Sequence, residues 1–133
     1  MIGADNEEPV RRFADAITGG DVEAAVAVCD PEIEFLSVLA LSGRAFTGHE
    51  GIRQYFDEVA SVWEEWRVEV HRTAAGPDGR VAILMTMHWR GRESGTAFSE
   101  RTGHVWTLRE GRLLRNEPFR DPEDALRALG VQG

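Results

Sequence analysis

The stretch that decides the fold runs from His104 to Leu113 and reads HVWTLREGRL. Its side chains alternate in character, Glu110-Gly111 interrupts them, and the alternation then resumes, which is typical of two antiparallel strands joined by a two-residue turn. Successive side chains of a strand point to opposite sides, so His104, Trp106 and Leu108 share one face. The sequence therefore predicts a titratable imidazole beside a large aromatic ring on the apolar face of a sheet.

Around this stretch the period of the apolar residues separates strands from helices. Alternation predicts four strands, and a shorter strand is expected at 33–37. Helical spacing predicts three helices before the strands and a short one after them, while 36–46 has no clear period and is predicted as a loop. The four strands are expected at 66–73, 80–90, 96–109 and 112–119, and the helices at 10–17, 22–29, 48–63 and 122–129. We expect one α+β domain with the helices packed on one face of the sheet.

Composition limits the classes of function. The 133 residues suit a single domain, 1–133, with an ordered core of about 9–130. The 23 acidic residues outnumber 15 basic ones, which argues against a nucleic-acid partner. Cys29 is the only cysteine and is predicted to lie in the core. No His–carboxylate pair has the helical spacing of a metal site, so no metal is expected. No other cofactor is expected either. The absence of a long apolar run and the acidic start predict a soluble cytoplasmic protein with no membrane partner.

Several landmarks, in this order and spacing, resemble one known family over nearly the whole chain. They are Phe13 before Gly20-Asp21, Asp30-Pro31 before Ile33, Gly48 with Gly51-Ile52, Ser94-Gly95, the stretch from His104 to Leu113, and Phe119-Arg120-Asp121. The chain thereby resembles the SnoaL-like branch of the nuclear transport factor 2-like superfamily. The resemblance implies a cone: a strongly curved antiparallel sheet wrapped around the N-terminal helices, with a pocket inside, often in a homodimer.

The resemblance does not carry over the catalytic residues of the characterised branches. The Tyr of ketosteroid isomerases falls on Phe13, their base falls near Leu36 or Ser37, and their late-strand Asp falls on His104. SnoaL-type polyketide cyclases place an Asp at that same position, with a His in the region of His88. Of the Asp-Arg-Asp set in limonene-epoxide-hydrolase-like members, only one acid position has a counterpart, near Glu117.

The face of the strand at 80–90 stays open at this point. If His88 pairs with about Glu100, then His88 shares the face of His104. A one-residue slip would put Met85, Met87 and Trp89 there instead, because it inverts every side chain of the strand.

We expect a pocket in which His104 acts as acid or base and Glu117, on the same predicted face of the next strand, orients it. The residues expected to bind substrate are Phe13, Tyr55, Trp63, His88, Glu100, Trp106, Arg115 and Phe119. The predicted function is cofactor-independent proton transfer, of isomerase, cyclase or hydrolase type, on a hydrophobic small molecule. A non-catalytic ligand-binding or dimerisation module is the alternative.

A homodimer is expected through the outer face of the sheet. Val105 and Thr107 are predicted to point outward there, with Met85 or Ala97 adding apolar area that a partner could cover.

Overall fold

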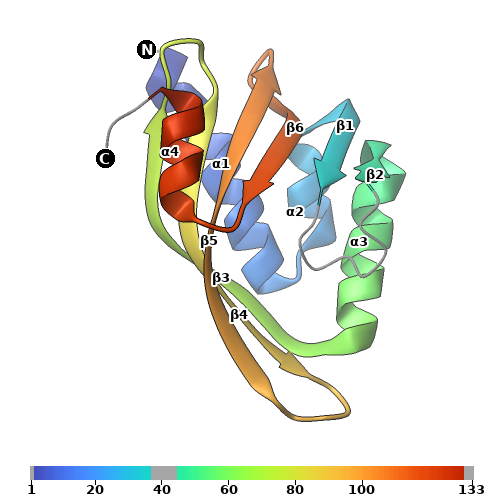
Figure 1. The fold of residues 1–133 in the computed structure, drawn as a ribbon. Coiled ribbons are helices and arrows are strands. Elements are labelled where there is room, and N and C mark those ends of the chain that lie inside the picture. The colour runs from blue at the N-terminus through green and yellow to red at the C-terminus, as the bar shows by residue number, and fades with distance from the viewer. Residues whose placement is uncertain (1, 37–44, 131–133) are drawn as a thin grey trace.

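The computed structural model describes residues 2–36 and 45–130, which form a curved sheet with helices on both faces (Figure 1). Within these ranges the helices are α1 (Ile2–Gly19), α2 (Val22–Ala27), α3 (Gly48–Val62) and α4 (Pro122–Leu129). The strands are β1 (Cys29–Leu36), β2 (Ala45–Thr47), β3 (Trp63–Ala75), β4 (Val81–Gly91), β5 (Ala97–Arg109) and β6 (Arg112–Phe119). They form one six-stranded sheet in the order β2-β1-β6-β5-β4-β3. The predicted α+β architecture with a curved sheet is confirmed.

The β5–β6 hairpin forms at the predicted turn. Glu110 and Gly111 have φ values of 53° and 77°, and positive φ at both central residues is what a type I′ turn needs. The sheet is not wholly antiparallel, however, because β1 runs parallel to β6. A helix and several strands separate β1 from β6 along the chain, so no tight turn dictates their relative direction.

Several predicted boundaries needed correction. The first helix begins at Ile2, eight residues before the predicted start at residue 10. The second helix ends at Ala27, so Cys29 begins β1 rather than closing the helix, and Trp63 begins β3 rather than ending α3. Ala45–Thr47, inside the predicted loop, forms β2, while Ser37 lies outside the described residues. Cys29 is buried as predicted, and burial raises the pKa of its thiol to about 12.

The pairing of β4 with β5 settles which face of β4 points inward. Ile83 lies opposite His104, and Met87 lies opposite Glu100. The second alternative is therefore correct, because Met85, Met87 and Trp89 share the face of His104.

Two apolar cores lie on opposite faces of the sheet. The larger one packs α1, α2 and α3 against the inner face, which carries Trp106 and Met87. The smaller one packs α4 against the outer face, where Leu126 meets Leu84 and Val105. In Figure 1, α4 lies in front of the sheet and α1 behind it. The prediction that all helices share one face was wrong for α4.

Gly103 lets α4 lie this close to β5. A Cβ at this position would be 2.9 Å from the Cβ of Ala125 and 3.0 Å from the Cα of Pro122. Val105, which follows on the same face, is buried under the helix. None of the helices in the described ranges is long and apolar enough to cross a membrane.

Candidate functional site

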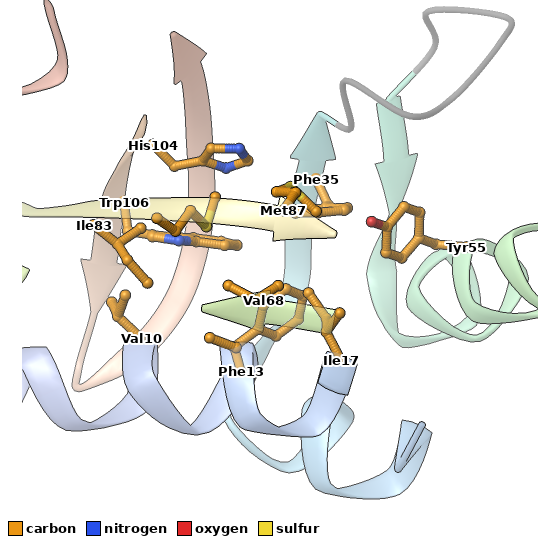
Figure 2. Close-up of a pocket in the computed structure, with 12 residues that line it drawn as sticks. Val10, Phe13, Ile17, Phe35, Tyr55, Val68, Ile83, Met87, His104 and Trp106 are labelled. Carbon is orange, nitrogen blue, oxygen red and sulfur yellow. The ribbon is translucent and has the colours of Figure 1, made fainter. Parts of the chain in front are cut away.

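The inner face of the sheet and α1 enclose a cavity of about 30 Å³ (Figure 2). Four residues expected at the site, Phe13, Tyr55, His104 and Trp106, lie in its wall. The rest of the wall is Val10, Ala14, Ile17, Phe35, Val68, Ile83, Met85 and Met87. Apart from His104 and the phenol of Tyr55, these side chains are apolar. This volume holds about one or two water molecules.

Aromatic rings build one side of the cavity. Phe35 stacks on Trp106 with an interplanar angle of 11°, and Phe13 meets the edge of Trp106 at a centroid distance of 5.2 Å. Tyr55 reaches in from α3 and meets Phe35 at 4.7 Å. Offset and edge-to-face contacts of this kind add to the stabilisation that burial provides. The wall is therefore a packed aromatic cluster contributed by four different elements, α1, β1, α3 and β5.

Asn116 fixes the orientation of the His104 ring. The side-chain oxygen of Asn116 accepts from Leu36 N at 2.7 Å, and its Nδ2 donates to Leu36 O at 2.8 Å. The second Nδ2 hydrogen is directed to His104 Nδ1 at 3.0 Å. Nδ1 must therefore be an acceptor, and in the neutral ring the proton sits on Nε2. The backbone of β1 thus determines the tautomer of a histidine on β5.

The Nε2–H of His104 has no acceptor within the described residues. Burial lowers the pKa of this imidazole from 6.5 to about 4, so the ring is neutral near pH 7. A buried donor without a partner destabilises a fold by about 1–3 kcal/mol, and groups of this kind need a structural or functional explanation. His104 therefore offers a free hydrogen-bond donor in the wall of an apolar cavity.

Glu117 does not lie beside His104, so this part of the predicted site was wrong. Thr107 pairs with Arg115, but Leu108 pairs with Leu113, which leaves Leu114 as an extra residue in β6. Such a bulge inverts the alternation that follows it.

After the bulge along the chain, Asn116 points inward and is buried, while Arg115 and Glu117 are exposed on the outer face. The doublet Leu113-Leu114, in an otherwise alternating strand, is the signal that could have revealed the bulge and Asn116.

The remaining residues expected to bind substrate lie away from the cavity. Phe119 packs on the outer core under α4. Glu100 is exposed near the start of β5, at the end of the strand away from Trp106. His88 is on the outer face, where it bonds Ser99 and Glu69.

Trp63 lines a separate, solvent-open groove of about 580 Å³ between α1, α3 and β3. Trp66 lines the same groove, and its buried indole N–H also lacks an acceptor within the described ranges. No group of three or more His, Cys, Asp or Glu side chains in residues 2–36 and 45–130 is arranged to hold a metal ion.

A family model for the SnoaL-like domain matches residues 10–116. The mixed α+β architecture with a curved sheet agrees with this match, and the chain belongs to the SnoaL-like family. The family supports small-molecule binding as the general kind of function. A search of the curated proteins finds no significant match.

Solved structures of similar proteins share the fold. An NTF2-like protein of unknown function from Burkholderia pseudomallei is 20% identical, with a TM-score of 0.77, over 96% of this chain and 98% of that one. A candidate polyketide cyclase from Xanthomonas campestris is 13% identical, with a TM-score of 0.79, over 97% and 99%. A Mycobacterium tuberculosis protein in complex with estradiol-17β-hemisuccinate is 14% identical, with a TM-score of 0.76, over 88% and 94%. At these identities the likeness establishes the fold alone.

Proposed function

We propose that this protein binds a small, mainly hydrophobic molecule that carries one hydrogen-bond-accepting oxygen. The observation that carries the proposal is the Nε2–H of His104, a buried donor without an acceptor in the described residues, in an aromatic and aliphatic wall. A ligand oxygen placed there would satisfy the donor, while the rest of the ligand would contact Phe13, Phe35 and Trp106. Ligand pockets commonly combine an apolar lining with a few placed polar groups.

The size of the cavity sets a condition on the ligand. About 30 Å³ is far below the volume of a polycyclic molecule, so a larger ligand has to displace side chains. Met85 and Met87 line the cavity, and methionine is the apolar side chain that adapts most easily to a new shape. We infer that rotation of these two side chains enlarges the cavity on binding.

The chemistry that His104 supports best is stabilisation of negative charge on an oxygen. Its Nδ1 lone pair is engaged by Asn116 and its Nε2 carries the proton, so the neutral ring is a donor rather than a general base. A fixed N–H directed at a carbonyl oxygen stabilises the oxyanion that forms during proton transfer, as a neutral histidine does in other enzymes. Cofactor-independent isomerisation, cyclisation or hydrolysis is the reaction class that such a donor serves.

A binding module without turnover is the second candidate function. It is favoured by the cavity wall, which among the described residues contains no carboxylate able to move a proton. Turnover that disappears in His104→Leu while ligand binding persists would favour the enzyme, and ligand binding without turnover in the wild type would favour the module.

A matched pair of ligands tests the proposed role of His104. Cyclohexanone and methylenecyclohexane have similar shapes, but only the ketone accepts a hydrogen bond. We expect the wild type to bind the ketone about tenfold more tightly, which is the effect of one net hydrogen bond. NMR titration of the Trp106 indole signal, which reports on the cavity wall, gives both affinities.

His104→Leu is the matched variant, because it replaces the imidazole with an apolar side chain of moderate size and so removes the donor. The preference for the ketone should disappear while the affinity for methylenecyclohexane is kept. An unchanged preference in the variant, or no binding of either ligand to the wild type, would overturn the proposal.

Self-association remains a prediction, and its expected surface needs correction. Val105 is buried under α4 and Met85 points into the cavity wall, so neither contributes an exposed apolar patch on the outer face. The family resemblance is what supports a homodimer. Light scattering measures it directly, and a mass of about 15 kDa, that of one chain, at tens of micromolar would reject it.

A further inference from the structure

The outer face of the sheet carries a hydrogen-bonded chain of three side chains that takes no part in the cavity. Ser99 Oγ lies 2.7 Å from His88 Nδ1, and His88 Nε2 lies 2.9 Å from Glu69 Oε1. The three residues stand on neighbouring strands, β5, β4 and β3, and His88 is directly opposite Ser99. Ser99 and His88 lie near the turn that joins β4 to β5, whereas α4 packs against Ala82, Leu84 and Val105, nearer the other end of these two strands. Ser99 is exposed to solvent.

The proton positions follow from the neighbours. The hydrogen bond from His88 holds the pKa of Glu69 below its usual range, with His71 and Arg67 contributing, so Glu69 is a carboxylate and accepts the Nε2–H. In the neutral ring Nδ1 then has its lone pair free to accept from the hydroxyl of Ser99. The hydrogen bonds therefore link Ser99, His88 and Glu69 in the order nucleophile, base and orienting carboxylate, which is the order that nucleophilic catalysis uses.

Two arginines flank the serine on the same face. Arg101 follows Ser99 by two residues on β5, and Arg90 lies diagonally opposite on β4, where it pairs with Ala97. Diagonal neighbours are about 7–8 Å apart at the backbone, within the reach of a long side chain. Neither guanidinium has an ion-pair partner within the described residues. Both are therefore available to an anionic group, or to an oxyanion formed beside Ser99.

We propose that Ser99, His88 and Glu69 form a second site, on the outer face of the sheet, which cleaves small carboxylic esters whose acyl part carries a further negative charge. Ser99 acts as the nucleophile, His88 as the base, and Glu69 as a positioning residue. Arg90 and Arg101 attract the anionic substrate. Nothing in this site depends on the interior cavity or on His104.

The reaction proceeds in two balanced steps. In the first, Ser99 Oγ bonds to the ester carbonyl carbon while its proton passes to His88 Nδ1. The bond from carbon to the alcohol oxygen then breaks, and the alcohol leaves with that proton. In the second, water attacks the acyl-serine with His88 as the base, which releases the carboxylic acid and restores Ser99. The sum is ester plus water giving acid plus alcohol, with no redox change.

The test uses two chromogenic esters and the whole chain, at a concentration where light scattering gives the mass of one chain. The neutral probe is 4-nitrophenyl acetate, and the anionic probe is the mono-4-nitrophenyl ester of glutaric acid. We expect Ser99→Ala and His88→Gln each to lower the rate by about tenfold or more. Peptide mass spectrometry after the acetate probe should find the acetyl group on Ser99.

His71→Gln is the matched control for unspecific imidazole catalysis. His71 lies on the same face and contributes to the low pKa of Glu69, but it bonds Thr86 rather than a serine, so the rate should fall far less than in His88→Gln. The double variant R90Q/R101Q should slow the anionic ester several-fold more than the neutral one. Wild-type rates in folded Ser99→Ala, acetylation of His88 instead of Ser99, or equal loss in His71→Gln would overturn the proposal.

Discussion

The two faces of β4 and β5 place a histidine in opposite surroundings. His104 on the inner face is fully enclosed, bonds the amide of Asn116 and has no second partner within the described residues. His88 on the outer face is partly open to water and bonds a carboxylate and a hydroxyl. In both rings the neighbours place the neutral ring's proton on Nε2. The inner ring is left as a donor, and the outer ring is left as an acceptor for a nucleophile.

The comparison shows that the chemistry of an imidazole follows from its partners rather than from its place in a strand. Each of these histidines alternates regularly with its neighbours on a long strand, and each has a partner on the adjacent strand. The inner partner is a neutral amide that is itself held by the backbone of Leu36, and the outer partner is a charged side chain. Breaking the inner partnership should therefore affect folding much more than breaking the outer one.

Asn116→Leu should give the largest effect, because it removes three hydrogen bonds from the inner face while it keeps the same number of side-chain heavy atoms. Leu36 loses the partner of its N–H and of its carbonyl, and His104 loses the donor to Nδ1. We expect the free energy of unfolding to fall by about 3 kcal/mol. Urea denaturation followed by circular dichroism measures it.

Ser99→Ala is the matched change on the outer face, where one hydrogen bond to His88 is lost in contact with water. The expected change is below about 0.5 kcal/mol. Equal destabilisation by the two variants would contradict the contrast between the faces.

Lowering the pH should destabilise the protein through His104 by a smaller amount. The unfolded ring has a pKa near 6.5 and the folded ring a pKa of about 4. Between these values the unfolded state binds more protons, so stability is complete above about 6.5 and decreases as the pH falls towards 4. From about pH 7 to about pH 5 this amounts to about 2 kcal/mol.

His104→Gln removes this titration and keeps an acceptor for Asn116. Urea unfolding at both pH values should show a pH dependence smaller by that amount in the variant than in the wild type. The same dependence in both would mean that His104 is not the group responsible.

Gly103→Ala tests the contact of α4 with the outer face, on the strand that carries His104 inward. The new methyl group would overlap Ala125 and the backbone of Pro122, so α4 has to shift. Overpacking of this kind destabilises by about 1–3 kcal/mol, and we expect a value near the lower end because a short terminal helix can move. Thermal unfolding measures the loss, and A125G in the same chain should recover part of it.

Most of the fold could be predicted because it rests on local patterns. The alternation in β3 to β6, the Glu110-Gly111 turn and the helical spacing of the apolar residues each reflect interactions between near neighbours in the sequence. The parallel pairing of β1 with β6 and the position of α4 depend on contacts between distant segments, and no pattern within either segment specifies them.

The candidate site could be predicted only up to the bulge in β6. His104 and Trp106 precede it on β5 and lie where the alternation places them, in the cavity wall. Beyond Leu114 the same rule, applied without the bulge, selected Arg115 and Glu117 and passed over Asn116. The orientation of Asn116 further depends on its hydrogen bonds to the backbone of Leu36, and no pattern in the sequence indicates this contact.

Glu117→Gln should have the smallest effect, and it tests the side of the sheet on which this residue lies. Glu117 is exposed and pairs with Val105, whose face is opposite to that of His104. Removing its charge should change the free energy of unfolding by less than about 0.5 kcal/mol. The pKa of the His104 ring, followed by its ¹³C signals, should stay the same. A carboxylate beside His104 would instead favour the imidazolium, so its removal would lower the pKa of the ring. An unchanged His104 titration in Glu117→Gln, beside an altered one in Asn116→Leu, would establish the amide as the partner of the histidine.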